Sequence, residues 1–162
     1  MISIRRANNR DIEAICSLIF NIWQQEYGFD VSPDDTPDLL DIEANYPKES
    51  AGFLLAAYKG KVIGTIATQR LEKGYWVLKR MFVHSDHRGT GVAQRLMDEL
   101  MAWLQQNSDK GDMLCLSTKE SQAVRAKHFY LRNGFSMISK DTLPRTFPYF
   151  YEDDLFMQLE LE

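Results

Sequence analysis

Two glycines separated by one residue lie where an apolar stretch changes to a helical pattern. Residues 83–92 read VHSDHRGTGV, with Arg88 directly before Gly89, Thr90 and Gly91. The first N–H groups of a helix have no internal partner, and glycine lets an anion approach them closely. Arginine adds a forked cation that suits phosphate. The pattern predicts a pyrophosphate site, although a plain turn with a solvent-facing arginine would look similar.

Other phosphate-binding loops fit this segment less well. No Gly-Lys-Ser/Thr sequence follows the glycines, and the third glycine of the dinucleotide fingerprint is missing. The turn also lies in the middle of the chain and follows a hairpin pattern rather than opening a βαβ unit. These differences argue against nucleoside triphosphates and nicotinamide cofactors.

The periodicity around this turn predicts a single α/β domain, residues 1–162, with one mixed sheet flanked by helices. Asn8 or Asn9 is expected to cap the first helix, which Gly28 follows, and Asn133-Gly134 to stop the last. The segment 30–50 carries Pro33, Pro37 and Pro47 and is expected to be a mobile loop. Strands are expected at 2–6, 53–58, 61–72, 75–83, 113–118, 135–139 and 156–161; helices are expected at 12–23, 39–45, 92–104 and 121–132.

The overall composition limits the classes of molecule that the protein is expected to bind. The 162 residues carry a net charge of −4, which gives no general attraction to nucleic acid or to an anionic membrane. Cys16 and Cys115 lie in apolar stretches and are expected to be reduced core residues. The start of the chain shows no signal-peptide pattern and no run long enough to span a bilayer, so we predict a cytoplasmic protein.

A resemblance to a known family rests on two motifs. Arg88-Gly89-Thr90-Gly91-Val92-Ala93 resembles the acyl-CoA signature Arg/Gln-x-x-Gly-x-Gly/Ala of the GCN5-related N-acetyltransferases (GNAT). The stretch AKHFYLRNGF, residues 126–135, is similar to the closing helix of that family. The resemblance covers nearly the whole chain. It implies the GNAT-type acyl-CoA N-acyltransferase fold, acetyl-CoA as cosubstrate and no metal.

The resemblance also assigns the residues that bind the cosubstrate. In similar proteins the strand before the glycine turn separates from the next strand, and the pantetheine arm bonds to its backbone. A backbone N–H near Phe82 or Val83 would polarise the thioester carbonyl. The implied cosubstrate-binding residues are Met81, Phe82, Val83, Arg88, Gly89, Thr90, Gly91, Val92, Ala93 and Gln94.

In the implied reaction, an amine attacks the acetyl thioester directly. Tyr130 matches the family position that protonates the departing thiolate, although a core tyrosine would give the same pattern. The glutamate that many relatives carry on the fourth strand is absent, because that stretch reads Val77-Leu78-Lys79-Arg80. Glu26, Glu120 or an unassisted route remain open for the base. A cofactor-contacting asparagine is replaced by Ala123, with Gln122 or Ser121 as substitutes.

Other groups carry weaker indications. His84 and His87 have a metal-chelating spacing without a third ligand nearby, and His128 and Cys115 fit surface or core roles better than catalysis. Acids at 30–43 and 152–154 are candidates for steering a cationic amine, although solvated loops commonly carry such charges.

The acceptor predicted from these features is a small-molecule amine. A protein amine, or a non-catalytic acyl-CoA-binding module, remains an alternative. The aromatic connection RTFPYFYEDD, residues 145–154, resembles segments that flank the acceptor in relatives. Its residues Phe147, Tyr149, Phe150 and Tyr151 would serve equally in a homodimer contact.

Overall fold

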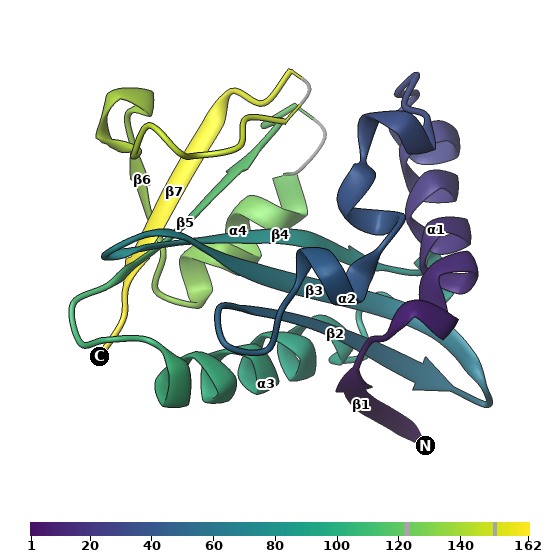
Figure 1. Ribbon diagram of the computed structural model, residues 1–162. Helices are drawn as coiled ribbons and strands as arrows, with labels where there is room; N and C mark the ends of the chain where they lie inside the picture. The colour runs from purple at the N-terminus through teal and green to yellow at the C-terminus, as the bar shows by residue number, and fades with distance from the viewer. Residues whose placement is uncertain (122–123, 151) are drawn as a thin grey trace. The chain divides into compact units, whose positions relative to one another are not determined.

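The computed structural model describes residues 1–121, 124–150 and 152–162 (Figure 1). In these residues, seven strands form a mixed sheet with four α-helices, in the element order predicted from the sequence. The strands are β1 (Ile2–Arg6), β2 (Ala51–Tyr58), β3 (Lys61–Glu72), β4 (Tyr75–Val83), β5 (Met113–Thr118), β6 (Ser136–Ile138) and β7 (Leu155–Glu160). The helices are α1 (Ile12–Asn21), α2 (Ile42–Asn45), α3 (Val92–Asn107) and α4 (Val124–Arg132).

Contacts divide the chain into two compact units. The first contains Met1–Gln69 and Lys79–Asn107, and the second contains Arg70–Leu78 and Ser108–Glu162. The strand order is β1-β2-β3-β4 through the first unit and β4-β5-β7-β6 through the second. Strands β3 and β4 each run from one unit into the other, so both units contribute to the sheet that was predicted.

The β2–β3 hairpin of the first unit follows the sequence prediction closely. Its two strands pair antiparallel from Ala51 opposite Gln69 to Tyr58 opposite Lys61. Lys59 and Gly60 make the turn with φ values of 50° and 78°. Two consecutive left-handed residues give the turn whose twist matches that of the paired strands.

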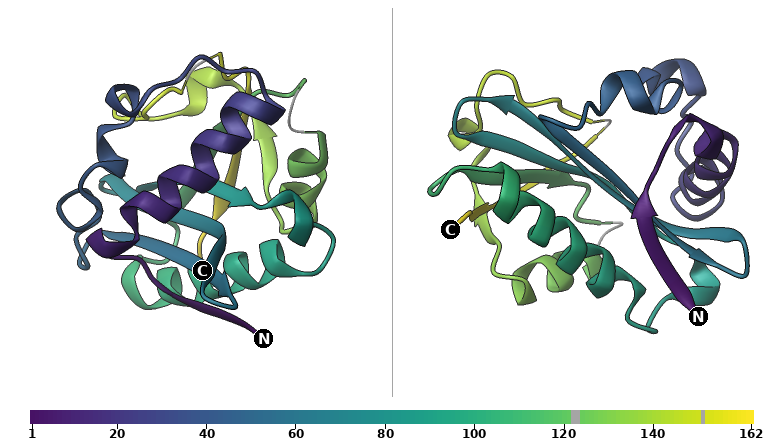
Figure 2. Two further views of the ribbon diagram at one scale, coloured as in Figure 1. Left: turned by 90° about the vertical axis from the view of Figure 1, so that its right-hand side faces the viewer. Right: turned by 60° about the horizontal axis from the view of Figure 1, so that its bottom comes forward.

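Helices α1 and α3 lie on opposite faces of β1, β2 and β3 (Figure 2). Helix α3 approaches the sheet closely because glycine occupies β3 beneath it. A Cβ on Gly64 would lie 3.0 Å from the Leu96 side chain and 3.2 Å from the Phe82 carbonyl oxygen. The apolar stripe of α3 is buried against this face, as its helical spacing predicted. It consists of Val92, Leu96, Met97, Leu100 and Leu104.

The first helix begins where the sequence places its cap. The Asn8 side chain accepts a hydrogen bond from the Arg10 N–H, and a 3₁₀ turn over Asn9–Asp11 leads into α1. A π-helical turn, Ile22–Glu26, continues from α1. Gly28 follows at φ 68°, a conformation that glycine adopts without strain.

The segment expected to be a loop with one short helix is more structured than predicted. It contains 3₁₀ turns at Pro33–Asp35 and Pro37–Leu39, followed by α2. The helix predicted at 39–45 is shorter, because Asp41 caps α2 by accepting from the Ala44 N–H. Leu39, Ile42 and Tyr46 are buried and anchor this segment within the first unit.

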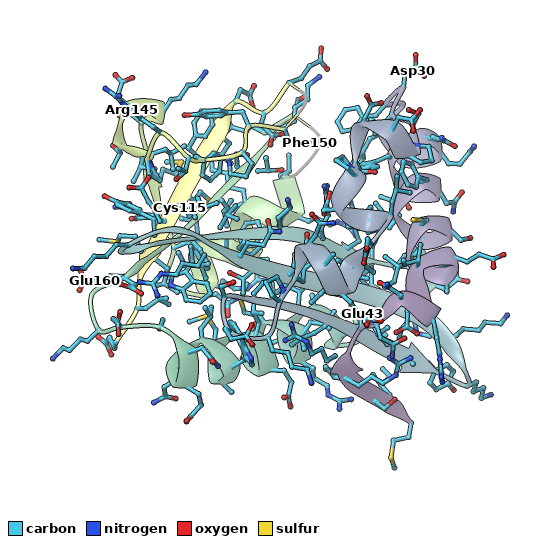
Figure 3. The ribbon with its side chains drawn as sticks, viewed as in Figure 1. Asp30, Glu43, Cys115, Arg145, Phe150 and Glu160 are labelled. Atoms are coloured by element: carbon cyan, nitrogen blue, oxygen red, sulfur yellow. The ribbon has the colours of Figure 1, made fainter. Side chains whose placement is uncertain are left out.

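In the second unit, β5 pairs parallel with β4 and antiparallel with β7. Its core includes Val77, Cys115 and Phe147, and Figure 3 marks Cys115 on β5. Gly134, at φ 92°, follows α4 in the left-handed conformation expected of a helix stop. Among the residues described, no helix is long and apolar enough to cross a membrane.

Candidate active site

The glycine turn connects β4 to α3 through backbone conformations that favour glycine. Gly89 and Gly91 have φ values of 76° and 88°, and the segment Arg88–Gly91 is solvent-exposed. A Cβ added to either glycine would meet no described atom within 4 Å outside its chain neighbours. The Thr90 hydroxyl donates to the His87 carbonyl and closes the turn. The first turn of α3 therefore presents its N–H groups beside open space, which suits an anion.

Arg88 lies at this turn, but its guanidinium already contacts a carboxylate. Its two terminal nitrogens lie 2.5 and 3.0 Å from the Glu26 oxygens, and its Nε donates to the Val83 carbonyl at 2.9 Å. About a third of each side chain remains exposed. Glu26, one of the two carboxylates considered as a base, is therefore engaged in an ion pair with Arg88. The ion pair also links the end of the first helix to the glycine turn.

The strand stretch expected to receive pantetheine is partly buried. Met81 and Phe82 are half-buried, and Val83 is 9% exposed. The Phe82 ring meets Trp23 edge-on at 5.4 Å, and the His84 N–H donates to the Ile63 carbonyl. These contacts anchor the middle of the stretch, and the residue that follows it, in the first unit.

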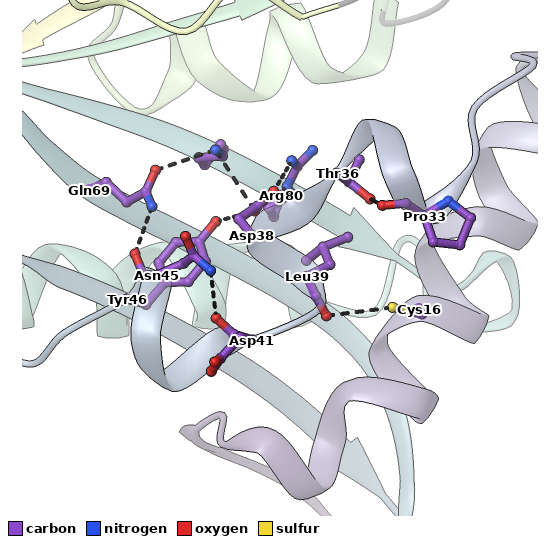
Figure 4. Close-up of polar contacts among 11 residues, drawn as sticks. Cys16, Pro33, Thr36, Asp38, Leu39, Asp41, Asn45, Tyr46, Gln69 and Arg80 are labelled. Atoms are coloured by element: carbon purple, nitrogen blue, oxygen red, sulfur yellow. Dashed lines mark hydrogen bonds and ion pairs between the residues drawn. The ribbon is translucent and has the colours of Figure 1, made fainter.

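Immediately before that stretch, β4 carries a charged cluster that the sequence analysis did not identify (Figure 4). Arg80 binds both Asp38 oxygens, at 3.0 Å from Nε and 2.8 Å from a terminal nitrogen. The Tyr46 hydroxyl donates to Asp38 at 2.6 Å. Lys79 Nζ lies 3.8 Å from Asp38 and 3.3 Å from the Gln69 side-chain oxygen. We call these five residues the Asp38 cluster.

The ionisation of the Asp38 cluster follows from its burial and its charges. Burial raises the pKa of Asp38, but the hydrogen bonds and charge of Arg80 outweigh it and leave that pKa below its ordinary value. Burial, and then the charge of Arg80, lower the pKa of Lys79 to about 8, although Asp38 acts in the opposite direction. Burial, and then Asp38, raise the pKa of Tyr46 well above its ordinary value. Asp38 is therefore ionised, while Lys79 gives up its proton more readily than an exposed lysine.

In the second unit, Tyr130 lies on α4 and is 6% exposed. Its ring meets Phe129 and Phe135 edge-on at 5.7 and 5.6 Å. Glu120, the other carboxylate considered as a base, forms an ion pair with Lys127 at 2.7 Å. Ser121 is exposed, whereas Gln122 and Ala123 lie outside the described residues, as does Tyr151 of the aromatic connection.

The second unit also holds a carboxyl group that titrates near neutrality. Asp153 accepts a hydrogen bond of 2.6 Å from the Ser117 hydroxyl. Burial raises the pKa of Asp153 to about 6, with Asp154 adding to the rise and Ser117 opposing it. The sequence offered only a run of acids here, because the contact joins β5 to a residue 36 positions away.

The two histidines before the turn line a pocket of about 300 Å³. His84 Nδ1 accepts from the Asp86 N–H at 3.1 Å, so a metal would have to bind that ring through Nε2. Over residues 1–121, 124–150 and 152–162, no group of three or more potential metal ligands occurs. Cys115 is buried, and burial raises the pKa of its thiol to about 11, which disfavours the nucleophilic thiolate.

Comparison with known proteins places this geometry in a family. Residues 49–137 match the sequence profile of the acetyltransferase (GNAT) domain, which is more than half of the chain. The chain belongs to the GNAT family. The match runs from before β2 into β6, and it includes the glycine turn, Lys79, Arg80 and Tyr130.

Individual relatives of this GNAT chain agree with that assignment. A solved GNAT acetyltransferase from Staphylococcus aureus is 31% identical, with full coverage of both chains and a TM-score of 0.92. The Xenopus tropicalis protein named "Probable N-acetyltransferase camello" is 31% identical over 110 residues, or 66% of this chain. This chain spans about half of that relative, 49% of its length.

A more distant fold relative was solved with coenzyme A bound. It is an N-acetyltransferase from Thermoplasma acidophilum, 18% identical, covering 99% of both chains with a TM-score of 0.72. At that identity the likeness concerns the fold. The mixed sheet with flanking helices is therefore the GNAT fold, as the two sequence motifs implied.

Proposed function

We propose that residues 1–162 form one N-acetyltransferase domain that transfers the acetyl group of acetyl-CoA to a primary amine of a small molecule. The observation that carries the proposal is the open glycine turn before α3, with Gly89 and Gly91 in conformations that favour glycine. It is supported by membership of the GNAT family and by the relative solved with coenzyme A.

In the proposed complex, N–H groups over residues 89–94 bind the pyrophosphate at the positive end of the α3 dipole. Arg88 adds charge beside them, in exchange for part of its contact with Glu26. The backbone of Met81, Phe82 and Val83 bonds the pantetheine arm, and an N–H of Phe82 or Val83 polarises the thioester carbonyl.

In the proposed reaction, the neutral amine nitrogen attacks the carbonyl carbon, and a C–N bond forms while the C–S bond breaks. Tyr130 donates its phenolic proton to the departing thiolate and recovers a proton from the amine through solvent. The amide product and free coenzyme A account for all atoms. We assign no protein base, because both carboxylates considered from the sequence, Glu26 and Glu120, are in ion pairs.

Calorimetric titration with acetyl-CoA tests the proposal. Wild-type protein should bind in the micromolar range, about −8 kcal/mol, and Gly91→Glu should abolish the heat signal because it adds charge and a side chain at the anion site. Gly60→Glu is the matched control, since Gly60 is also exposed, has a φ of 78° and meets no described atom. A folded wild type that binds no acetyl-CoA would overturn the proposal.

Turnover distinguishes the alternatives. Release of the free coenzyme A thiol should depend on an added small amine, and Tyr130→Phe should lower kcat while acetyl-CoA binding persists. Acetylation of peptides but not of free amines would favour a protein acceptor. Acetyl-CoA binding without turnover on either class would favour a non-catalytic acyl-CoA-binding module.

A further inference from the structure

The Asp38 cluster holds more positive than negative charge. Among its five residues, Arg80 and Lys79 are two cations, and Asp38, which both of them contact within 4 Å, is the one carboxylate. The side chains are mostly buried, with exposures of 8% for Arg80, 12% for Asp38 and 19% for Lys79. A charge held away from water is costly unless it is paired, so an unbalanced cation favours an anionic ligand.

The two cations share one side of β4 because the strand is distorted. Successive residues of a regular strand point to opposite faces, yet Lys79 and Arg80 both reach Asp38. Arg80 has a φ of 56°, a left-handed value that is unfavourable for a residue with a Cβ. The Thr65 hydroxyl donates to the Arg80 carbonyl at 2.7 Å and helps to hold that conformation. Strain of this kind persists where surrounding contacts maintain it, and it often accompanies function.

Within the cluster, the buried pair belongs to Arg80. It binds Asp38 through two hydrogen bonds, and it lies over the Trp23 ring at 5.5 Å. Lys79 has the looser contacts, at 3.8 Å from Asp38 and 3.3 Å from the neutral Gln69 amide. Lys79 is also the more exposed of the two cations, so a ligand would meet its ammonium group first.

Lys79 lies close in the chain to the proposed thioester site. Met81 follows Lys79 by two positions, a separation of at most roughly 7 Å along a strand, and it begins the stretch proposed to bond pantetheine. A lysine side chain spans a similar length. An acceptor whose amine reaches the thioester carbonyl can therefore place a second polar group near Lys79.

We propose that Lys79 binds a carboxylate of the acceptor, so that the amine substrate of this chain is an amino acid or a similar amino carboxylate. This inference rests on the proposed acetyltransferase function and narrows it to a substrate class. Arg80, Asp38 and Tyr46 position the Lys79 ammonium group, and the acceptor carboxylate supplies the missing negative charge. Burial, and then the charge of Arg80, lower the pKa of Lys79, and a bound carboxylate would offset both effects.

Kinetics with paired acceptors test the inference. Each amino acid, for example glycine, β-alanine and aspartate, is compared with the carboxamide of the same compound. Wild-type kcat/KM should favour the carboxylate member of the best pair at least tenfold. Lys79→Gln should remove at least nine-tenths of that preference, mainly by raising KM, whereas Lys79→Arg should retain it. The carboxylate-to-carboxamide ratio of kcat/KM for the wild type is divided by the same ratio for Lys79→Gln. This division cancels the difference in amine basicity between the two members of each pair.

Two controls keep the result specific. Lys61→Gln removes a lysine with the same charge from an exposed position at the start of β3 and should leave the preference unchanged. Propionate should compete with the acceptor of the wild type, and propionamide should compete at least tenfold less well. This measurement needs no variant and remains informative if a Lys79 variant folds poorly.

The outcomes separate this inference from the proposed function. Turnover of amines with no preference for carboxylates would overturn the inference and leave the acetyltransferase proposal standing. An equal loss of kcat on both members of each pair in Lys79→Gln would also overturn it, because Lys79 would then serve every acceptor alike. Absence of both acetyl-CoA binding and turnover in folded wild type would overturn the proposed function itself.

Discussion

Two arginine–carboxylate pairs of the first unit have similar geometry and different surroundings. Arg80 binds both oxygens of Asp38, and Arg88 binds both oxygens of Glu26, with all four distances between 2.5 and 3.0 Å. The side chains of the first pair are 8% and 12% exposed, whereas those of the second are 33% and 30% exposed. Exposure therefore decides what each pair can do.

The buried pair maintains structure, and the exposed pair remains available to a ligand. Removing one member of a buried pair leaves an uncompensated charge away from water. An exposed pair gives about 0–1 kcal/mol, because water and salt screen it and replace it. Arg80 is thus suited to hold β4 in its distorted form, while Arg88 can exchange a carboxylate for a phosphate.

The largest expected effect comes from breaking the buried pair. Arg80→Met should lower the free energy of unfolding by about 3–5 kcal/mol, because Asp38 would lose its main cationic partner. Arg88→Met should cost at most about 1 kcal/mol. Urea unfolding of both variants beside wild type measures the difference. Equal losses in the two variants would contradict the distinction drawn from burial.

The next effect is that of the hydroxyl group that also serves Asp38. Tyr46 is 2% exposed and donates to the carboxylate at 2.6 Å. Tyr46→Phe should cost about 1.5–3 kcal/mol, the range for a hydrogen bond to a charged group. Tyr58→Phe, at the half-exposed end of β2, is the matched control and should change stability by less than about 0.5 kcal/mol. The same urea series would show a small loss for Tyr46→Phe if Asp38 depends on Arg80 alone.

The contrast between the pairs also explains what the sequence could reveal. The glycine turn was found because backbone N–H groups and positive φ values require glycine, so the motif appears directly in the residue types. Strand β4, the β2–β3 hairpin and the apolar stripe of α3 were predicted for a related reason: periodicity and turn residues act locally.

The Asp38 cluster was not predicted because nothing local defines it. In the sequence, Asp38 is one of several acids in a proline-containing segment, and Lys79 and Arg80 stand in the strand where many relatives carry a glutamate. Asp38 and Arg80 are 42 positions apart in the chain, so only the fold brings them together. The left-handed Arg80 backbone, which brings Lys79 and Arg80 to the same carboxylate, is equally invisible in the sequence. One signal was present in the sequence: two adjacent cations within an otherwise apolar strand require a partner, because buried charges are paired.

The exposed pair can be tested through ligand affinity. Glu26→Gln removes the carboxylate that competes for Arg88, and it should tighten acetyl-CoA binding by up to about fivefold, the equivalent of up to about 1 kcal/mol. Glu43→Gln is the matched control for net charge, since Glu43 instead accepts from the Asn9 N–H. Titration of both variants at low and high salt measures the effect, which should shrink with salt. Weaker binding by Glu26→Gln would show that Glu26 orients Arg88 instead of competing for it.

Asp153 in the second unit is a third carboxylate for this comparison. Burial favours its neutral form, whereas Asp38 and Glu26 are paired with arginines. Its folded pKa of about 6 lies above its ordinary value of 3.8. Between these values the folded state binds more protons than the unfolded state, so the free energy of unfolding falls as pH rises from about 4 to about 6. The penalty is present above pH 6 and absent below about pH 4, opposite in sign to the contribution of Asp38.

Replacing Asp153 by asparagine should therefore remove the penalty selectively at neutral pH. The asparagine carbonyl still accepts the Ser117 hydroxyl, so the comparison isolates the charge. Partial exposure screens that charge, and we expect a gain of about 1 kcal/mol or less at pH 7, declining to zero near pH 4. Urea unfolding across this pH range measures it, with Asp34→Asn at an exposed position as the control. A gain that does not vary with pH would mean that Asp153 affects stability through packing and not through its charge. The effect of burial on a charged side chain would then be supported only by the two arginine–carboxylate pairs.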